Sequence, residues 1–288
     1  MLKHQEILAP YTSWHIGGPA EIYFRPQNLG HLQEYLSSLA AGQKLTWLGL
    51  GSNVLINDNG INGVLIHTLN ALKKLELDSD GLIYTEAGVT CAKFSKFAAK
   101  QGFVGAEFFS GIPGTMGGAL RMNAGAWGGE TWEHLIFADL INTQGEIKRY
   151  LKEDFEIFYR HIQFPKSITE SLWFVGAAFA FKPGDTLAAE TKIKALLQER
   201  QQKQPIGTHN CGSVFKNPPG HHAAVLINQL NLKNYRIGNA VVSEKHANFI
   251  INLGQARAQD VLELVKHIES EVFKAYGIVL EREFKILS

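Results

Sequence analysis

The chain has 288 residues, 45% of them hydrophobic and 19% charged, and this composition excludes an intrinsically disordered protein. A chain of this length buries a core large enough to fold without disulfide or metal staples. Lys and Arg number 28 against 27 Asp and Glu, so the formal net charge of +1 gives no indication of nucleic-acid or anionic-membrane binding.

The cysteine content and the lack of long apolar segments indicate the compartment. Cys91 and Cys211 are too few for a disulfide scaffold, and no CxxC motif occurs, which is typical of a reducing compartment. The N-terminus has no apolar signal core, and no uncharged apolar run approaches the roughly 18 residues of a membrane span. We therefore expect a soluble, cytoplasmic protein with no membrane insertion.

The predicted elements form an α+β mixture without regular βαβ alternation. In the first third of the chain, hydrophobic spacing predicts a helix over 31–39 and strands over 21–24, 44–50, 54–56, 64–67 and within 75–88. A helix over 92–100 is expected to end at Gly102, and strands follow at 136–141 and 172–181. After a break at 183–185 we expect helices over 187–204 and 259–275 and a final strand over 278–287.

Glycine exceeds its usual share of about 7%, and nine of the 28 glycines lie between Gly102 and Gly129. A first glycine-rich element, Gly49-Leu50-Gly51-Ser52-Asn53, follows a predicted strand. It lacks the third glycine and the helix of a dinucleotide-binding fingerprint, so a phosphate site at a helix N-terminus is not expected. Its backbone N–H groups can still converge on a pyrophosphate. An ordinary strand-to-strand turn explains the same residues and is favoured on this segment alone.

The second glycine-rich element runs from Ser110 to Ala119 and continues from Asn123 to Gly129. Glycine and alanine at this density let the backbone lie against a flat ligand with no side chain between them. Tight packing within the protein explains the same residues equally well. We expect neither glycine-rich element to lead into a helix, and together they favour a large, flat cofactor that carries phosphate.

These motifs resemble those of the UDP-N-acetylenolpyruvoylglucosamine reductases, bacterial enzymes of peptidoglycan precursor synthesis. The resemblance begins with the first glycine-rich element, followed by Asp58 and Gly60, then Gly111-Ile112-Pro113-Gly114-Thr115 with Gly117-Gly118, and Asn123-Ala-Gly-Ala126. It continues in collinear order through Phe158-Tyr-Arg-His161, Cys211-Gly-Ser-Val-Phe-Lys-Asn-Pro218, Tyr235-Arg-Ile-Gly238, Ser243-Glu-Lys-His-Ala-Asn-Phe249 and Leu280-Glu-Arg-Glu283. It therefore covers nearly the whole chain, and the motif at Cys211 resembles the shorter of the family's two classes.

The resemblance implies a flavin-binding fold of the vanillyl-alcohol-oxidase type, joined to a C-terminal α+β substrate-binding domain. Residues 1–70 and 71–185 would form two FAD-binding parts, with 278–288 returning to the first, and 186–277 would bind substrate. FAD would be held non-covalently. The implied cofactor-binding residues are Gly49, Gly51, Ser52, Asn53, Gly111, Ile112, Pro113, Gly114, Thr115, Gly117 and Gly118.

The implied reaction is the NADPH-dependent, FAD-mediated reduction of UDP-N-acetylglucosamine enolpyruvate to UDP-N-acetylmuramate, by a monomer. Three positions depart from the family pattern, because His15 stands where arginine is usual, Trp127 replaces a tyrosine and Lys285 replaces an arginine. They lie on the cofactor or pocket side, so they affect the detail of binding and leave the chemistry unchanged.

Reduction of an enolpyruvyl group needs a cation on the substrate carboxylate, support for the developing enolate and a donor for the α-carbon proton. A guanidinium grips a carboxylate with two parallel bonds and keeps its proton, which suits Arg160, although its spacing alone fits a surface arginine better. For Ser213, the sequence alone favours a serine that satisfies a turn. The resemblance implies that Arg160 holds the carboxylate, Ser213 donates the proton and Glu283 supports the enolate.

For the rest of the substrate, the resemblance implies that Lys203 and Asn217 bind the diphosphate and sugar, with Tyr159 near the enolpyruvyl end. His209, His221 and His222 suggest a metal site at first sight, but no cysteine or carboxylate spacing supports one, so no metal is expected. Two alternatives stay open: another flavin oxidoreductase of the same fold, and a flavin- or nucleotide-sugar-binding module that has lost its chemistry. Retention of Arg160, Ser213 and Glu283 together argues against the second.

Overall fold

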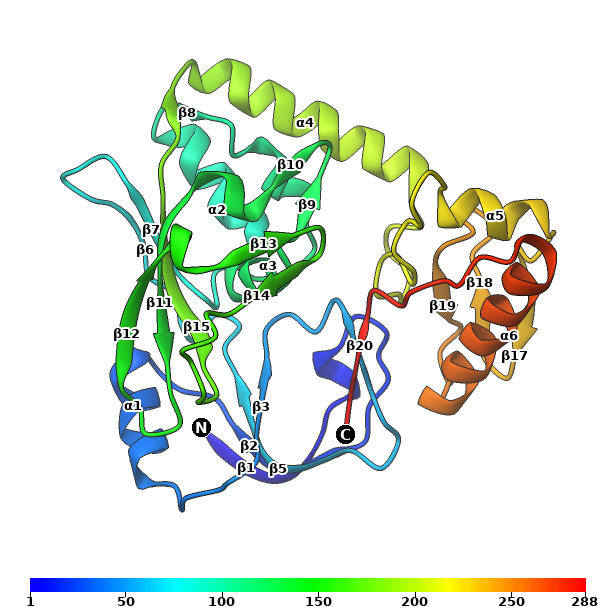
Figure 1. The fold of residues 1–288 in the computed structure, drawn as a ribbon, viewed down its shortest axis with the longest axis horizontal. Coiled ribbons are helices and arrows are strands. Elements are labelled where there is room, and N and C mark those ends of the chain that lie inside the picture. Colours follow the sequence, from blue (N-terminus) through cyan, green and yellow to red (C-terminus); the bar gives the residue numbers. More distant parts are fainter. The chain divides into compact units, whose positions relative to one another are not determined.

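The computed structural model describes residues 1–288 and separates the chain into two compact units, each assembled from distant stretches of sequence (Figure 1). The first unit contains Met1–Leu2, Phe24–Leu50 and Ile66–Glu199, and the second contains Lys3–Tyr23, Gly51–Leu65 and Arg200–Ser288. A four-stranded sheet has the order β1-β2-β5-β3, formed by β1 (Leu2–Ile7), β2 (Pro19–Phe24), β5 (Ile61–His67) and β3 (Leu45–Leu48). The division into three parts expected from the resemblance stays a prediction.

A five-stranded antiparallel sheet forms the centre of the first unit. Its order is β12-β11-β15-β7-β6, from β12 (Ile147–Leu151), β11 (Leu135–Ile141), β15 (Trp173–Phe179), β7 (Ile83–Glu86) and β6 (Leu75–Leu77). Strand β15 is buried along nearly its whole length, as expected for a central strand. The predicted strands over 136–141 and 172–181 are confirmed, as are those within 75–88.

Helices α2 (Cys91–Lys100) and α3 (Met116–Met122) pack beside this sheet, with α3 against β15 and β7 (Figure 1). Helix α2 begins where Thr90 accepts a bond from the Lys93 N–H at 3.3 Å and ends before Gly102, whose φ of +78° suits glycine. The prediction of α2 is therefore confirmed to within a residue. Burying a side chain such as Phe94 contributes about 1.5–3 kcal/mol.

Two further helices, three pairs of short strands and short 3-10 helices complete the description of the first unit. Helix α1 (Leu29–Ser38) begins at Asn28, whose side chain accepts a bond from the His31 N–H at 2.9 Å. The long helix α4 (Thr186–Lys203) follows β15 in the chain. Two-stranded pairs are formed by β8 (Phe103–Val104) with β16 (Lys182–Pro183), β9 (Gly125–Ala126) with β10 (Gly129–Glu130), and β13 (Glu156–Phe158) with β14 (His161–Gln163). Short 3-10 helices occupy Glu107–Gly111, Thr131–His134 and Lys152–Asp154.

The second glycine-rich element differs from the expectation, because it leads directly into α3. Thr115 caps this helix by accepting a bond from the Gly118 N–H at 3.4 Å, and the Met116 N–H donates to Val89 at 2.8 Å. Glycine disfavours a helix in isolation by about 1 kcal/mol per residue. Packing in the folded protein nevertheless requires glycine here, because a Cβ added at Gly117 would approach the Ala87 Cβ to 2.8 Å.

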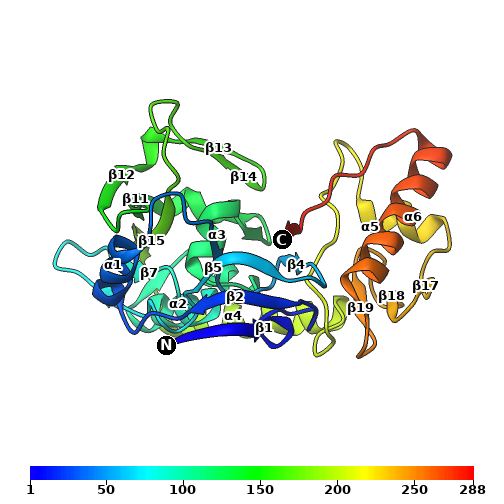
Figure 2. The same ribbon diagram turned by 90° about the horizontal axis from the view of Figure 1, so that it is seen from below.

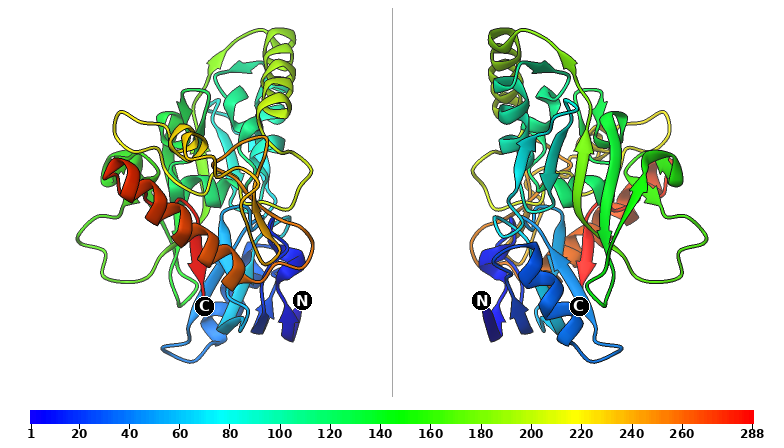
Figure 3. Two further views of the ribbon diagram at one scale, coloured as in Figure 1. Left: turned by 90° about the vertical axis from the view of Figure 1, so that its right-hand side faces the viewer. Right: turned by 90° about the vertical axis from the view of Figure 1, so that its left-hand side faces the viewer.

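In the second unit, the long helix α6 (Ala258–Tyr276) packs on the strands β17 (Arg236–Ile237) and β18 (Ala240–Val242) and on helix α5 (Ala223–Gln229) (Figure 3). Strand β19 (Ile250–Asn252) completes this three-stranded sheet, and the 3-10 helix Ala9–Tyr11 lies earlier in the unit. Helix α6 has its apolar side chains on one face, in a core that includes Trp14, Phe215 and Phe284. The predicted helix over 259–275 is therefore confirmed.

The end of the chain is less regular than predicted. Only β20 (Lys285–Leu287) forms a strand, and it pairs in parallel with β4 (Val54–Ile56), as Figure 2 shows near the C-terminus. Residues 278–284 form no strand, and among them Arg282 alone forms a bridge, with Phe215. The alternation that suggested a strand instead places Leu280 and Phe284 in the core. No helix is long and apolar enough to cross a membrane.

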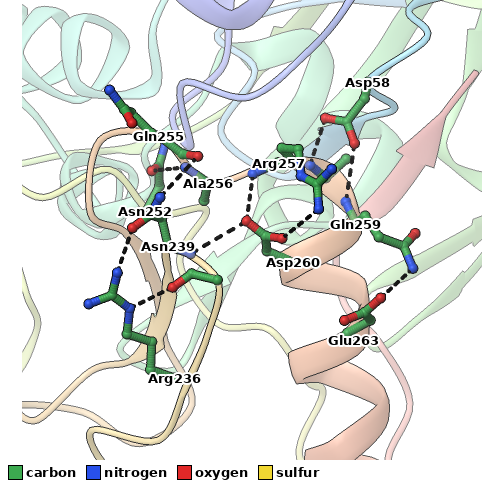
Figure 4. Close-up of polar contacts among 12 residues, drawn as sticks. Asp58, Arg236, Asn239, Asn252, Gln255, Ala256, Arg257, Gln259, Asp260 and Glu263 are labelled. Carbon is green, nitrogen blue, oxygen red and sulfur yellow. Dashed lines mark hydrogen bonds and ion pairs between the residues drawn. The ribbon is translucent and has the colours of Figure 1, made fainter.

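Asp58, one of the motif residues, holds the N-terminal end of α6 (Figure 4). Its carboxylate accepts bonds from the backbone N–H groups of Ala258 at 2.8 Å and Gln259 at 3.3 Å. The first N–H groups of a helix have no partner within the helix, and a carboxylate there also interacts favourably with the helix dipole. Asp58 thus ties a loop near the start of the chain to a helix two hundred residues later.

Candidate active site

The first glycine-rich element lies between β3, which ends at Leu48, and β4, which begins at Val54. Gly51 has φ of +71°, and an added Cβ would collide with the carbonyl oxygen of Tyr11, so this position requires glycine. The Ser13 N–H donates to the Gly51 carbonyl at 3.0 Å. The backbone N–H groups of Gly51 and Ser52 have no acceptor within the protein, which leaves two successive donors for an anion.

Asn53, at the end of the same element, joins it to a candidate catalytic residue. Its side-chain amide donates to the backbone carbonyl of Glu283 at 3.1 Å, and the Lys285 N–H donates to the Asn53 carbonyl at 3.0 Å. These bonds hold the start of β4 beside the C-terminal segment. Lys285, one of the departures from the family pattern, is exposed and contributes here through its backbone.

The two glycine-rich elements meet within the first unit. An alanine at Gly49 would collide with the Thr115 hydroxyl, and His67 donates from Nε2 to the Gly49 carbonyl at 3.1 Å. An added Cβ at Gly111 would collide with the ring of Trp127. Packing within the protein therefore requires several of these glycines, whatever they bind. Within the first unit, the small side chains around Gly49 and residues 111–118 leave the backbone open to a flat ligand.

Arg160 lies at the turn between β13 and β14, with φ of +56°. Its Nη2 donates to the Gly125 carbonyl at 2.9 Å, and its guanidinium lies 4.9 Å from the ring centre of Tyr159. Arg160 is half-buried, unlike an ordinary surface arginine, whereas the Tyr159 side chain is exposed. The hairpin thus presents an anchored cation beside an accessible aromatic ring.

Asn123 anchors this hairpin. It belongs to one of the motifs named in the sequence analysis, where it was given no role. It is fully buried, and its side-chain amide donates to the Glu130 carboxylate at 2.7 Å and to the Phe158 carbonyl at 3.2 Å. Its side-chain oxygen accepts from the Trp132 N–H at 3.1 Å. The φ of +45° at Asn123 is one that asparagine tolerates better than most residues. The one signal in the sequence for this anchoring role is the position of an asparagine at the end of a glycine-rich helix.

Ser213 and Glu283 come from paired segments of the second unit. The Glu283 N–H donates to the Val214 carbonyl at 2.8 Å, and the Lys216 N–H donates to the Glu281 carbonyl at 2.9 Å. Both Ser213 and Glu283 are partly buried, which suits groups that must reach a substrate. The segments of two predicted catalytic residues are therefore adjacent in space although they lie seventy residues apart.

Charge and burial around this pair act on the neighbouring cysteine. Burial, assisted by the carboxylate of Glu283, raises the pKa of the Cys211 thiol well above its usual value, so the thiol stays protonated. Cys91 is likewise buried and free. Glu281, two residues before Glu283, is exposed and forms an ion pair with Lys216.

The predicted substrate-binding residues of the second unit are exposed. Lys203 ends α4, and Asn217 accepts a bond from the Ala223 N–H at 3.1 Å, which fixes the start of α5. A pocket of about 400 Å³ near His134 and Lys152 contains none of the predicted site residues. No group of three His, Cys, Asp or Glu side chains is placed to hold a metal ion.

The departure at His15 has a local partner. Its ring stacks on His209 with centres 4.0 Å apart, and burial together with the nearby His209 lowers the pKa of His15. Trp127, the second departure, has φ of +49° and is 38% exposed while its ring covers Gly111. Both departures thus make contacts of their own within the protein.

Two protein-family models match this chain. One, described as an FAD binding domain, covers residues 20–150, and the other, the C-terminal domain of UDP-N-acetylenolpyruvoylglucosamine reductase, covers residues 204–287. The UDP-N-acetylenolpyruvoylglucosamine reductase of Coxiella burnetii is 47% identical, over 97% of this chain and 93% of its own length. That of Alkalilimnicola ehrlichii is 46% identical, over 99% of this chain and 94% of its own.

A solved structure agrees with these sequence relatives. The UDP-N-acetylenolpyruvylglucosamine reductase of Thermus caldophilus matches with a TM-score of 0.84 and 30% identity, over 100% of this chain and 98% of that one. The expected fold, a flavin-binding domain followed by a C-terminal α+β domain, is thereby confirmed, and so is FAD as the cofactor. The chain belongs to the UDP-N-acetylenolpyruvoylglucosamine reductase family.

Proposed function

We propose that Arg160, Ser213 and Glu283 carry out the reaction of this family in the present chain. As a family member the protein is an FAD-dependent oxidoreductase, which uses NADPH to reduce UDP-N-acetylenolpyruvoylglucosamine during peptidoglycan precursor synthesis. The observation that supports the proposal is the backbone pairing of the Ser213 and Glu283 segments, because two of the three motif residues then belong to adjacent stretches of chain.

Bound FAD supplies the chemistry that the side chains lack, since it accepts a hydride from NADPH and passes one to the enolpyruvyl group. Gly49, Gly51, Ser52 and Asn53 would hold it together with residues 111–118. In support, Gly51 and Ser52 offer two successive N–H donors, and the glycines keep side chains away from the backbone. A buried anion site made of backbone donors needs no charged side chain.

Arg160 binds the substrate carboxylate in this proposal. The Gly125 carbonyl fixes one Nη atom, which orients the planar guanidinium before substrate arrives. Negative charge increases on the carboxylate side as the enolate develops, so a fixed cation stabilises the transition state more than the bound substrate. Tyr159 next to it would contact the enolpyruvyl end, and Lys203 and Asn217 would contact the diphosphate and sugar.

Ser213 donates its hydroxyl proton to the α-carbon, and Glu283 supports the enolate that precedes this step. A serine hydroxyl is a weak acid, so its proton transfer requires a position close to the α-carbon and stabilisation of the alkoxide that remains. Gly212, with φ of +82°, and the bond from its N–H to the Asn210 side chain at 2.9 Å form a tight turn immediately before Ser213. We also propose that one chain acts alone, as a monomer in the cytoplasm, where NADPH is available.

The two half-reactions test this proposal. Stopped-flow absorbance should show anaerobic bleaching of the flavin by NADPH and then reoxidation by UDP-N-acetylglucosamine enolpyruvate. In Ser213→Ala the first step should be unchanged, while reoxidation slows by about 10²–10⁴-fold through loss of a positioned donor. Reoxidation of this variant at the wild-type rate would show that Ser213 is structural. A wild-type protein that is reduced by NADPH but reoxidised only by other acceptors would favour a different oxidoreductase of the same fold.

A further inference from the structure

The segment that carries Ser213 is held along both of its edges. On one edge it pairs with residues 281–283, through the two backbone bonds described above. On the other edge lies Asn248, which is 3% exposed and belongs to a motif for which the reaction provides no role. Its backbone carbonyl accepts a bond from the Val214 N–H at 2.9 Å.

The side chain of Asn248 acts like a short neighbouring strand. Its oxygen accepts from the Phe215 N–H at 3.0 Å, and its nitrogen donates to the Phe215 carbonyl at 2.8 Å. A primary amide carries a donor and an acceptor side by side, so it can satisfy the backbone N–H and the backbone carbonyl of the same residue at once. Aspartate has the same shape, but when ionised it only accepts hydrogen bonds.

The loop that presents Asn248 is itself fixed. Ser243 is 1% exposed, and its hydroxyl accepts bonds from the N–H groups of Lys245 and His246, each at 3.2 Å. The Ser243 N–H donates to the Phe249 carbonyl at 2.8 Å. A closed loop of this kind transmits its position to Asn248, and through Asn248 to the two residues that follow Ser213.

We propose that Asn248 is a positioning residue for the reaction, which sets the place of the Ser213 hydroxyl by gripping the backbone of Val214 and Phe215. The inference rests on the proposed proton donation by Ser213. Loss of the amide leaves the pairing with 281–283 and the backbone bond between Val214 and Asn248 in place, so the fold persists while Phe215 loses its two side-chain partners. A displacement of about 1 Å at a reacting group costs on the order of 10²-fold in rate.

The test compares Asn248→Ala and Asn248→Asp with wild type in both half-reactions. Flavin reduction by NADPH should stay within about twofold, whereas reoxidation by the enolpyruvyl substrate should slow by about 10–10²-fold. Asn252→Ala is the matched control. Asn252 is also 3% exposed and makes three side-chain bonds, to Trp14, Gly254 and Ala256, but none to the Ser213 segment. It should lower the melting temperature without selectively slowing reoxidation.

A double-mutant cycle separates positioning from general destabilisation. If Asn248 acts through Ser213, then Asn248→Ala introduced into Ser213→Ala should slow reoxidation no further. Independent, multiplying effects would overturn the proposal, as would wild-type reoxidation by Asn248→Ala. Loss of folding or of FAD in both Asn248 variants would also overturn it. If the enolpyruvyl substrate does not reoxidise the reduced wild-type protein, the proposed function itself is refuted, and not only the role of Asn248.

Discussion

Replacing Gly49 with alanine should destabilise the protein, because the new methyl group would collide with the Thr115 hydroxyl and lie 3.3 Å from the Thr115 methyl group. Gly49 does not have a positive φ, so the backbone itself accepts alanine and the conflict is one of packing. Rotating Thr115 away removes the N-cap bond to Gly118, which is worth about 1 kcal/mol. Overpacking adds about 1–3 kcal/mol.

The unfolded state offsets part of this loss, since alanine restricts it by about 0.4–1 kcal/mol more than glycine does. The free energy of unfolding should therefore fall by about 2 kcal/mol, measured by urea denaturation. Gly118→Ala is the matched control, because its added Cβ would meet only the Thr115 hydroxyl, at 3.7 Å. That variant should be at least as stable as wild type, since alanine favours the helix by about 1 kcal/mol.

The double variant Gly49→Ala/Thr115→Ala distinguishes the collision from other causes. Thr115→Ala removes the colliding hydroxyl and leaves an ordinary contact of 3.4 Å to its Cβ. The double variant should be no less stable than Thr115→Ala alone, which corresponds to a coupling of about 1–3 kcal/mol. Additive losses, or a Gly49→Ala protein as stable as wild type, would refute the reasoning.

Three further predictions concern the anchors of the site. Arg160→Lys keeps the charge but loses the planar fork, so kcat should fall by about 10²-fold while FAD stays bound; unchanged turnover would contradict carboxylate binding by Arg160. Asn123→Ala leaves the buried Trp132 N–H without its partner and should lower the free energy of unfolding by about 2–4 kcal/mol, measured in urea. An unchanged free energy of unfolding would show that the amide is dispensable. Burial, assisted by the charge of Arg25, lowers the pKa of His67 to about 4. The unfolded state then binds the extra proton first, so stability should fall by up to about 3 kcal/mol as the pH drops from 6.5 to 4. In His67→Gln that loss should be smaller, and an equal loss would rule out His67 as its source.

Helices with clear ends could be predicted from the sequence, and those held by packing could not. Thr90 and Gly102 define α2, because a cap and a left-handed glycine act locally. Helix α3 has glycines in its first turn, and its formation depends on Gly117 packing against Ala87, about thirty residues earlier. Residues 278–284 show the opposite failure. Their alternating pattern is that of a strand, but they make only an isolated bridge, because the length over which a neighbour pairs with them depends on the tertiary structure.

The residues of the candidate site could likewise be predicted only in part from the sequence. Motif resemblance supplied Arg160, Ser213 and Glu283, since these residue types suit the chemistry. It gave no role to Asn123 and Asn248, because the function of an amide depends on the backbone groups that it contacts, and each of these two contacts a group more than thirty residues away. The φ of +56° at Arg160 was equally hidden, since arginine has no preference for it.

The assembly of the second unit from both ends of the chain has a consequence for synthesis on the ribosome. Trp14 donates from its indole to the Ile250 carbonyl, a residue that is translated 236 positions later. At about 5–20 residues per second, that partner emerges roughly 10–50 s after the tryptophan. The first unit can begin to fold before this interval ends, because its last residue, Glu199, is translated before Ile250. Until then the apolar residues near the N-terminus lack the partners of their hydrophobic core, and they are a binding site for a nascent-chain chaperone during that period.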